Sequence, residues 1–106
     1  MRVILFALAL TACSSEPVSR SIGARCDVSS ECDERCLTGG DFPGGFCSIS
    51  CDNNTGCPNG TVCMNDQGGA CVFTCAADPD CAFLGAGWTC KEVDAKPTGK
   101  VMVCRG

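Results

Sequence analysis

The sequence predicts a small disulfide-rich protein built from three tandem four-cysteine modules, each a loop plus a short β-hairpin, with little regular secondary structure. Thirteen of the 106 residues are cysteine, a fraction above the level that marks a disulfide scaffold. The chain has no His or Tyr, one Trp and five Phe, which is little bulky apolar material for a conventional core in so small a domain. The spacing of the cysteines also repeats along the chain.

Residues 1–12 have the pattern of a signal peptide for export. Arg2 is followed by an apolar run from Val3 to Leu10, which matches the charged and apolar regions of such a signal. The run is too short to span a bilayer, which takes about 20 residues. A buried helix or strand is the alternative, but small and polar residues and Pro17 follow at once. We therefore expect a secreted chain whose signal is removed.

The end of this segment, Leu10-Thr11-Ala12-Cys13, resembles the bacterial lipobox, in which a Leu and two small residues precede an invariant Cys. The resemblance implies a lipoprotein that is cut before Cys13, with Cys13 as the lipid attachment site, carrying diacylglycerol and acyl chains such as palmitate. A cysteine suits this chemistry because its thiolate is the nucleophile. Plain secretion, the alternative, prefers small residues where Leu10 stands. Several acyl chains on one residue give stable membrane anchoring.

Residues 13–25 form the expected lipidated cysteine and flexible tether. The stretch "SSEPVSRSIGAR" is polar and is interrupted by Pro17 and Gly23, a composition with little capacity for burial. A strand added to the first module is the alternative. Ser14 after the lipidated cysteine resembles the class of Gram-negative lipoproteins directed to the outer membrane, so the resemblance implies an outer-membrane location in the cell envelope.

Twelve cysteines remain once Cys13 is set aside, and export places them where disulfides persist. Zinc sites favour Cys-x-x-Cys pairs and often His, and the sequence contains neither. A thioredoxin-like redox role fails for the same reason, so we expect no metal and no cofactor. The expected disulfide cysteines are Cys26, Cys32, Cys36, Cys47, Cys51, Cys57, Cys63, Cys71, Cys75, Cys81, Cys90 and Cys104.

The modules are expected at residues 26–50, 51–74 and 75–106. Each begins with a Cys-x5-Cys loop rich in Asp, Asn and Ser, "CDVSSEC", "CDNNTGC" and "CAADPDC", and these polar residues favour turns. A calcium loop is the alternative, but no EF-hand pattern is present. Glycine- and proline-containing inserts then separate the third and fourth cysteines, which predicts hairpins with these cysteines on their arms. Such repetition predicts tandem units rather than one folded core.

Spacing does not fix how the cysteines pair. If each module closes on itself, three patterns remain, and we favour the crossed one, first to third and second to fourth. In the middle module this gives Cys51 with Cys63 and Cys57 with Cys71. The cadence, carried by "CPNGTVC" and "GGACVFTC", resembles the cysteine-rich repeats of exported Gram-negative lipoproteins and, more loosely, EGF-like and Dickkopf N-terminal modules. It lacks the Cys-x-Cys pair of EGF.

The net charge and its distribution narrow the classes of partner that the chain could bind. Removing residues 1–12 takes away one of eight basic residues and none of twelve acidic ones, which changes the net charge from −4 to −5 and argues against nucleic acid as a partner. Between Cys26 and Cys90 only Arg35 opposes nine acidic residues, whereas the last hairpin is basic. This hairpin is either a solvated face or a docking surface, head to tail or on an anionic surface.

The leading functional interpretation is a lipid-anchored, disulfide-stabilised envelope protein that acts as a binding or structural module. Its expected partners are the membrane, through the N-terminal lipid, and a protein or envelope component recognised by loops. An enzyme is not expected, because no His is present and the cysteines are accounted for. The alternative is a protease inhibitor that presents a rigid loop around an exposed Lys96. Trp88 is expected to cover the disulfides of the third module, with a role as a binding aromatic as its alternative.

Overall fold

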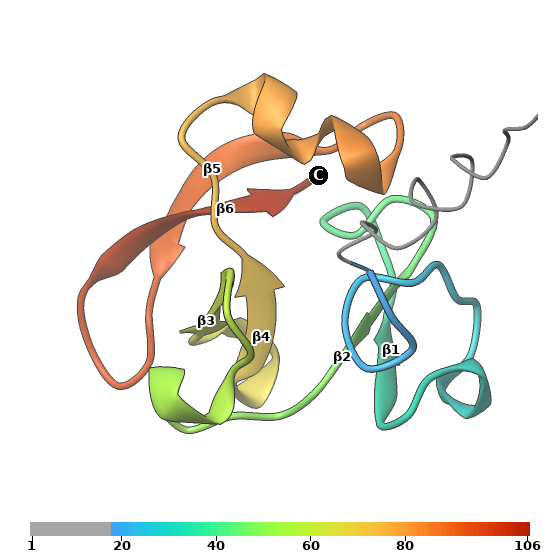
Figure 1. Ribbon diagram of the computed structural model, residues 1–106, viewed down its shortest axis with the longest axis horizontal. Coiled ribbons are helices and arrows are strands. Elements are labelled where there is room, and N and C mark those ends of the chain that lie inside the picture. The colour runs from blue at the N-terminus through green and yellow to red at the C-terminus, as the bar shows by residue number, and fades with distance from the viewer. Residues whose placement is uncertain (1–17) are drawn as a thin grey trace, which may run out of the picture.

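The computed structural model describes residues 18–106, so the expected signal peptide (1–12), Cys13 and the first part of the tether lie outside the described residues. Three separate two-stranded antiparallel hairpins follow one another along the chain (Figure 1). Short 3-10 turns precede the first hairpin, lie within the second, and connect successive hairpins, and this arrangement confirms the small disulfide-rich fold. The strands are β1 (Arg35–Leu37), β2 (Phe46–Ser48), β3 (Thr61–Met64), β4 (Ala70–Phe73), β5 (Thr89–Asp94) and β6 (Lys100–Arg105). The 3-10 turns are η2 (Ser29–Glu31), η3 (Asn54–Gly56), η4 (Asp66–Gly68) and η5 (Asp78–Leu84).

Each hairpin sets the third and fourth cysteines of its module directly opposite each other on the two arms. The opposed residues are Cys36 and Cys47, Cys63 and Cys71, and Cys90 and Cys104. This register confirms the hairpins expected from the sequence. The β3–β4 turn ends at Gly69, whose φ is +103°. A Cβ there would lie 2.2 Å from the carbonyl oxygen of Cys51, so only glycine fits this close approach.

The disulfides follow the crossed pattern in all three modules. The first cysteine pairs with the third and the second with the fourth, which confirms the pairing favoured from the sequence. The loops that they close span 10 to 23 residues in sequence, and a loop of 15 residues is worth about 3 kcal/mol through the unfolded chain. The pairs are Cys26–Cys36, Cys32–Cys47, Cys51–Cys63, Cys57–Cys71, Cys75–Cys90 and Cys81–Cys104.

The three tandem modules are present, but one hydrophobic cluster runs through all of them, so the expectation of units without one folded core is wrong. Few aromatic residues suffice, since they gather at one place. Phe46 is fully buried, and its ring centroid lies 5.4 Å from that of Trp88 and 6.0 Å from that of Phe73. The larger buried side chains of the cluster are Ile22, Leu37, Phe42, Phe46, Met64, Val72, Phe73, Leu84, Trp88, Val93 and Val103.

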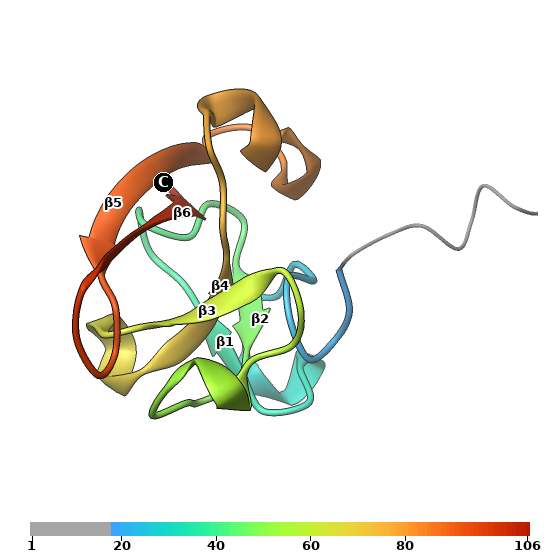
Figure 2. The same ribbon diagram turned by 60° about the vertical axis from the view of Figure 1, so that its left-hand side comes forward.

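The middle module lies between the other two. Single β-bridges join Ser50 to Ala70, on the side of the first module, and Thr74 to Val103, on the side of the third. The long β5–β6 hairpin curves around β3–β4, and the chain end returns to the loop of the first module (Figure 2). There the N–H of Gly106 donates to the carbonyl oxygen of Asp41 at 2.7 Å. The modules are therefore repeated in sequence and interlocked in space.

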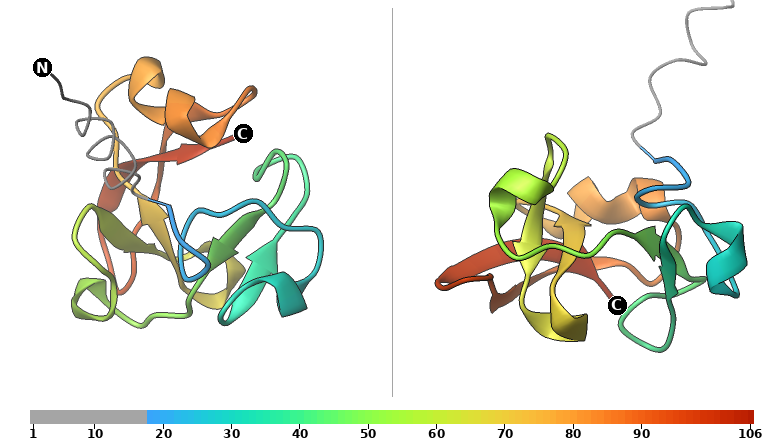
Figure 3. Two further views of the ribbon diagram at one scale, coloured as in Figure 1. Left: turned by 45° about the vertical axis from the view of Figure 1, so that its right-hand side comes forward. Right: turned by 90° about the horizontal axis from the view of Figure 1, so that it is seen from below.

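The described part of the expected tether packs on the first module and is hydrogen-bonded to it. Residues 18–25 lie against the first module in both views of Figure 3, and Ile22 is 3% exposed. The N–H of Gly23 donates to the carbonyl oxygen of Cys47 at 2.8 Å, and the N–H of Cys47 donates to that of Ala24 at 2.9 Å. These two bonds hold the segment against β2, although it forms no strand of its own, so the alternative of an added strand is met only in its docking on the first module.

Candidate functional site

The disulfide framework brings the two bridges of every module together. In each module the sulfur atoms of the first, second and fourth cysteines all lie within 4.8 Å of one another. All twelve sulfur atoms are used in disulfides. Such a compact pair of bridges fixes the leading loop to both arms of its hairpin.

A side-chain hydrogen bond at one repeated position reinforces each framework. Three residues after the first cysteine of each module, a side-chain oxygen accepts the main-chain N–H of the third cysteine. The donor–acceptor pairs are Cys36 N–H to Ser29 Oγ at 3.2 Å, Cys63 N–H to Asn54 Oδ1 at 2.9 Å, and Cys90 N–H to Asp78 Oδ1 at 2.9 Å. Sequence reasoning missed this role. The sequence does carry a sign of this role, because a short oxygen-bearing side chain stands three residues after the first cysteine in all three loops.

Two carboxylates close the leading loops from the position just before the second cysteine. Glu31 accepts the main-chain N–H groups of Asp27 and Val28 at 2.7 and 3.4 Å. Asp80 accepts those of Ala76 and Ala77 at 2.8 and 3.1 Å. These hydrogen bonds hold the pKa of both carboxyls below their usual values.

The middle module has glycine at the equivalent position, Gly56, and closes its loop differently. Asn53 precedes η3, and its Oδ1 accepts the N–H of Thr55 at 2.9 Å, as expected of a helix-capping asparagine. In each of the three loops, polar side chains therefore accept hydrogen bonds from main-chain N–H groups of their own module. This confirms the turn role expected of them.

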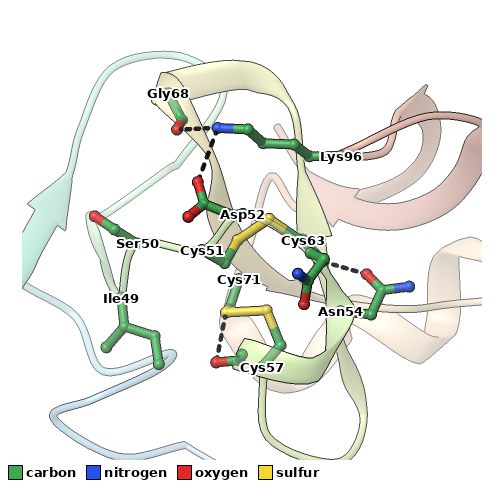
Figure 4. Close-up of a disulfide and its surroundings, with 12 residues drawn as sticks. Ile49, Ser50, Cys51, Asp52, Asn54, Cys57, Cys63, Gly68, Cys71 and Lys96 are labelled. Carbon is green, nitrogen blue, oxygen red and sulfur yellow. Dashed lines mark hydrogen bonds and ion pairs between the residues drawn. A yellow bond between two sulfur atoms is a disulfide. The ribbon is translucent and has the colours of Figure 1, made fainter.

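The loop around Lys96 bends onto the second module. The N–H of Lys96 donates to the carbonyl oxygen of Cys63 at 2.9 Å, and its Nζ donates to that of Gly68 at 3.0 Å. Nζ also lies 3.5 Å from Asp52 Oδ1, and only 29% of the side chain is exposed. Figure 4 shows Lys96 pointing toward Gly68 and Asp52. The expectation of an exposed Lys96 is wrong, because the turn of the second module offers it acceptors.

Two arginines reach the same turn, η4, from other modules. Arg105 of β6 donates to Asp66 Oδ2 at 2.9 Å and to Asp41 Oδ2 of the first module at 2.5 Å. Arg35 of β1 donates to the carbonyl oxygen of Gln67 at 2.6 Å. We call Arg35, Lys96 and Arg105 the basic clasp. The three residues of η4 each accept a hydrogen bond from one member of it.

The Arg105 side chain is largely enclosed, with 14% of it exposed. Burial lowers the pKa of Arg105, but the hydrogen bonds and charges of Asp41 and Asp66 outweigh this effect and raise it overall. The guanidinium therefore stays charged and joins the first, second and third modules at one point. Such forked, charge-assisted bonds are stronger than neutral ones.

The basic residues of the terminal hairpin pair largely with acidic residues and carbonyl oxygens of the same chain. The terminal hairpin does dock on an acidic surface, and through Lys96 and Arg105 that surface belongs to its own first two modules. Lys100 pairs with Asp94 of the same hairpin at 2.6 Å. Lys91 donates to the carbonyl oxygen of Gly106 at 2.5 Å. The hairpin's basic residues thus have partners inside the described chain.

Trp88 lies at the junction of the third and first modules. Its side chain is 5% exposed and packs beside Phe42 and Phe46, and its Nε1–H donates to the carbonyl oxygen of Pro43 at 2.9 Å. The sequence placed Trp88 over the disulfides of its own module. In the structure it shares one buried cluster with Cys81 and Cys104 of that module and packs on the first module as well. It is also too enclosed to offer its ring to a ligand.

The described residues present a surface of loops and short strands. No pocket is found within residues 18–106, and no helix in that range has the length and apolar character needed to cross a membrane. Among residues 18–106, the exposed large apolar side chains are Val28, Phe83 and Met102. No family model, curated protein or solved structure matches the chain.

Proposed function

We propose that the chain is a lipid-anchored, disulfide-stabilised lipoprotein of the Gram-negative cell envelope that acts as a binding or structural module. One observation carries the proposal. Residues 18–106 pair all twelve of their cysteines, so the thirteenth, Cys13, has no part in this framework. It stands at the end of a lipobox-like motif, where a cysteine serves as the lipid acceptor.

The six disulfides support an envelope location. Disulfides persist in oxidising compartments such as the bacterial periplasm and are rare in the cytosol. Every module depends on its two bridges to hold a leading loop that contains only one short 3-10 turn. A chain of this kind needs export in order to fold. This requirement agrees with the signal-like residues 1–12.

The rigidity of the framework supports a role in binding or structure. The bridges and the basic clasp fix the hairpins, and the loops between them face solvent, a common arrangement for recognition. The partner class is a protein or another envelope component. Lys96 is held against Gly68 and Asp52, so the geometry does not favour an inhibitory loop there. We expect the purified domain to leave a panel of trypsin-like proteases active.

The test is expression of the full chain in a Gram-negative host that is fed a labelled fatty acid. The wild-type chain should take up label and partition into the detergent phase after membrane extraction. Cys13→Ser should take up none. Cys36→Ser is the matched control, since it removes a disulfide cysteine and leaves the lipid acceptor, so it should retain the label. A wild-type chain that takes up no label and stays in the aqueous phase would contradict the proposed lipid anchor.

A further inference from the structure

A tight exposed turn leads into β3. The N–H of Thr61 donates to the carbonyl oxygen of Pro58 at 3.0 Å, and the Thr61 hydroxyl donates to the same oxygen at 2.7 Å. Asn59 and Gly60 occupy the two central positions, and both are exposed. Gly60 has a φ of +88°, the left-handed region that glycine adopts at little cost.

The main-chain nitrogen of Gly60 has no hydrogen-bond acceptor among the described residues that would hold it back from attacking the side chain of Asn59. No heavy atom lies within 4 Å of the place where a Cβ of Gly60 would stand, so the space on that side of Gly60 is open. The carbonyl oxygen of Gly60 is held by the N–H of Thr74 at 3.1 Å. Its own N–H donates to no acceptor in residues 18–106. The turn therefore fixes its two ends and leaves the central peptide unengaged.

The other asparagines are placed differently, although all lie in the second module. The Oδ1 of Asn53 accepts from Thr55, and the Oδ1 of Asn54 accepts from Cys63. Asn54 is also followed by a β-branched residue whose N–H is already bonded. Asn65 has no side-chain bond within the described range, but it is followed by Asp66, whose side chain restricts the peptide. Only Asn59 combines an unengaged side chain with a following glycine.

We propose that Asn59 is a site of covalent modification, namely deamidation through a succinimide. The Gly60 nitrogen, on losing its proton, attacks Cγ of Asn59 and forms a five-membered ring. The bond from Cγ to Nδ2 breaks, and Nδ2 leaves as ammonia with that proton. Water then opens the ring at either carbonyl and gives an aspartate or an isoaspartate at position 59. The net reaction consumes one water and releases one ammonia, with no change of oxidation state.

The modification changes the surface and the turn. Either product adds one negative charge to an already acidic chain. The isoaspartate also inserts an extra backbone carbon between Pro58 and Thr61, which lengthens the turn and breaks the 3.0 Å bond between them. The entry to β3 is therefore altered, and an enzyme that methylates isoaspartate carboxyls would recognise the product. This inference does not depend on the lipid anchor.

The experiment follows the folded, disulfide-intact chain during incubation at mildly alkaline pH, with peptide mapping by mass spectrometry and enzymatic methylation of isoaspartate. Asn59 should lose its amide at least about tenfold faster than Asn53, Asn54 or Asn65, a difference of about 1.4 kcal/mol in barrier. Earlier loss at any of those three would overturn the proposal.

Two comparisons sharpen the result. Asn59→Gln keeps the amide and disfavours the five-membered ring, so isoaspartate labelling of that peptide should disappear. The reduced and alkylated chain measures the rate without structure. The deamidation rate at Asn59 in the folded chain should lie within about tenfold of the rate in the reduced and alkylated chain, a difference of about 1.4 kcal/mol in barrier. The reason is that the Gly60 N–H makes no hydrogen bond within the described part of the chain that must first be broken. Slower loss in the folded chain would show that the turn protects Asn59 and would also overturn the proposal.

Discussion

Trp88 and Pro43 stand 45 residues apart and are joined by a hydrogen bond of 2.9 Å from the indole Nε1–H to the proline carbonyl oxygen. The bond ties the only tryptophan of the third module to the hairpin loop of the first. The indole ring of Trp88 packs on Phe42 and Phe46. Two modules that are far apart in sequence thus share one buried contact, and the protein behaves as one body.

Replacement of Trp88 tests this shared contact. Trp88→Phe keeps an aromatic ring and removes the donor, so it should lower the free energy of unfolding by about 1–3 kcal/mol, the cost of leaving a buried acceptor unpaired. Trp88→Ala also leaves a cavity and should cost about 3–5 kcal/mol. Denaturant unfolding with the disulfides intact, followed by circular dichroism, measures both. Equal stability of all three proteins would contradict a structural role for the indole.

The basic clasp predicts that Arg105 matters more than an ordinary surface charge. Arg105→Ala removes a mostly enclosed guanidinium and leaves Asp41 and Asp66, each about half exposed, without their partner. The loss should lie between the 0–1 kcal/mol of a surface pair and the roughly 3–5 kcal/mol of a fully buried one. Arg20→Ala is the matched control, because its pair with Asp33 is more than half exposed on both sides. Similar losses for the two variants in thermal unfolding would argue against the clasp.

The repeated bond to the third cysteine predicts a local effect. Asn54→Ala leaves the N–H of Cys63 without its acceptor and should cost about 1–3 kcal/mol. It should also speed amide hydrogen exchange at Cys63 relative to Cys36 and Cys90, whose acceptors remain. Asn65→Ala serves as the control, since the side chain of Asn65 makes no hydrogen bond in residues 18–106. Unchanged exchange at Cys63 would show that the bond contributes nothing.

Acid should weaken the leading loops of the first and third modules. Hydrogen bonds from main-chain N–H groups hold the pKa of Glu31 below 4.5 and that of Asp80 below 3.8, their ordinary values. A lowered folded pKa stabilises the fold above the ordinary pKa, and the gain is lost as pH falls through the folded value. The Tm should therefore be level near neutrality and fall below pH 4.5. The double variant Glu31→Gln, Asp80→Asn should fall less steeply in the same pH series, and an identical slope would refute the assignment.

The repeat was visible in the sequence because cysteine spacing and turn residues are local. The hairpin arms at Cys63 and Cys71 followed from that spacing. The crossed pairing was one of three patterns left if each module closes on itself, and it was favoured because it ties the leading loop to both arms of the hairpin. The packing between modules was not visible, since it depends on contacts such as Trp88 to Pro43 that no periodicity marks. Lys96 was misjudged for the same reason, because its acceptors, Gly68 and Asp52, belong to another module.

The residues that accept the N–H of the third cysteine were only partly visible in the sequence. Ser29, Asn54 and Asp78 differ in type, so they do not stand out as a motif. They share an oxygen within reach of the main chain at one offset from the first cysteine. An alignment of the three modules with one another would have found them. The segment 18–25 was assigned to a tether because its composition is polar, and its bonds to Cys47 depend on a strand edge that only the folded module provides.

The intact mass of the chain extracted from envelope membranes tests the central claim most directly. The account predicts a chain that begins at Cys13, carries the mass of a diacylglyceryl group and further acyl chains, and is lighter by two hydrogens for each of six disulfides. After reduction and alkylation, twelve cysteines should be labelled and Cys13 should not. A chain with no acyl mass, in which Cys13 is labelled with the others, would contradict it.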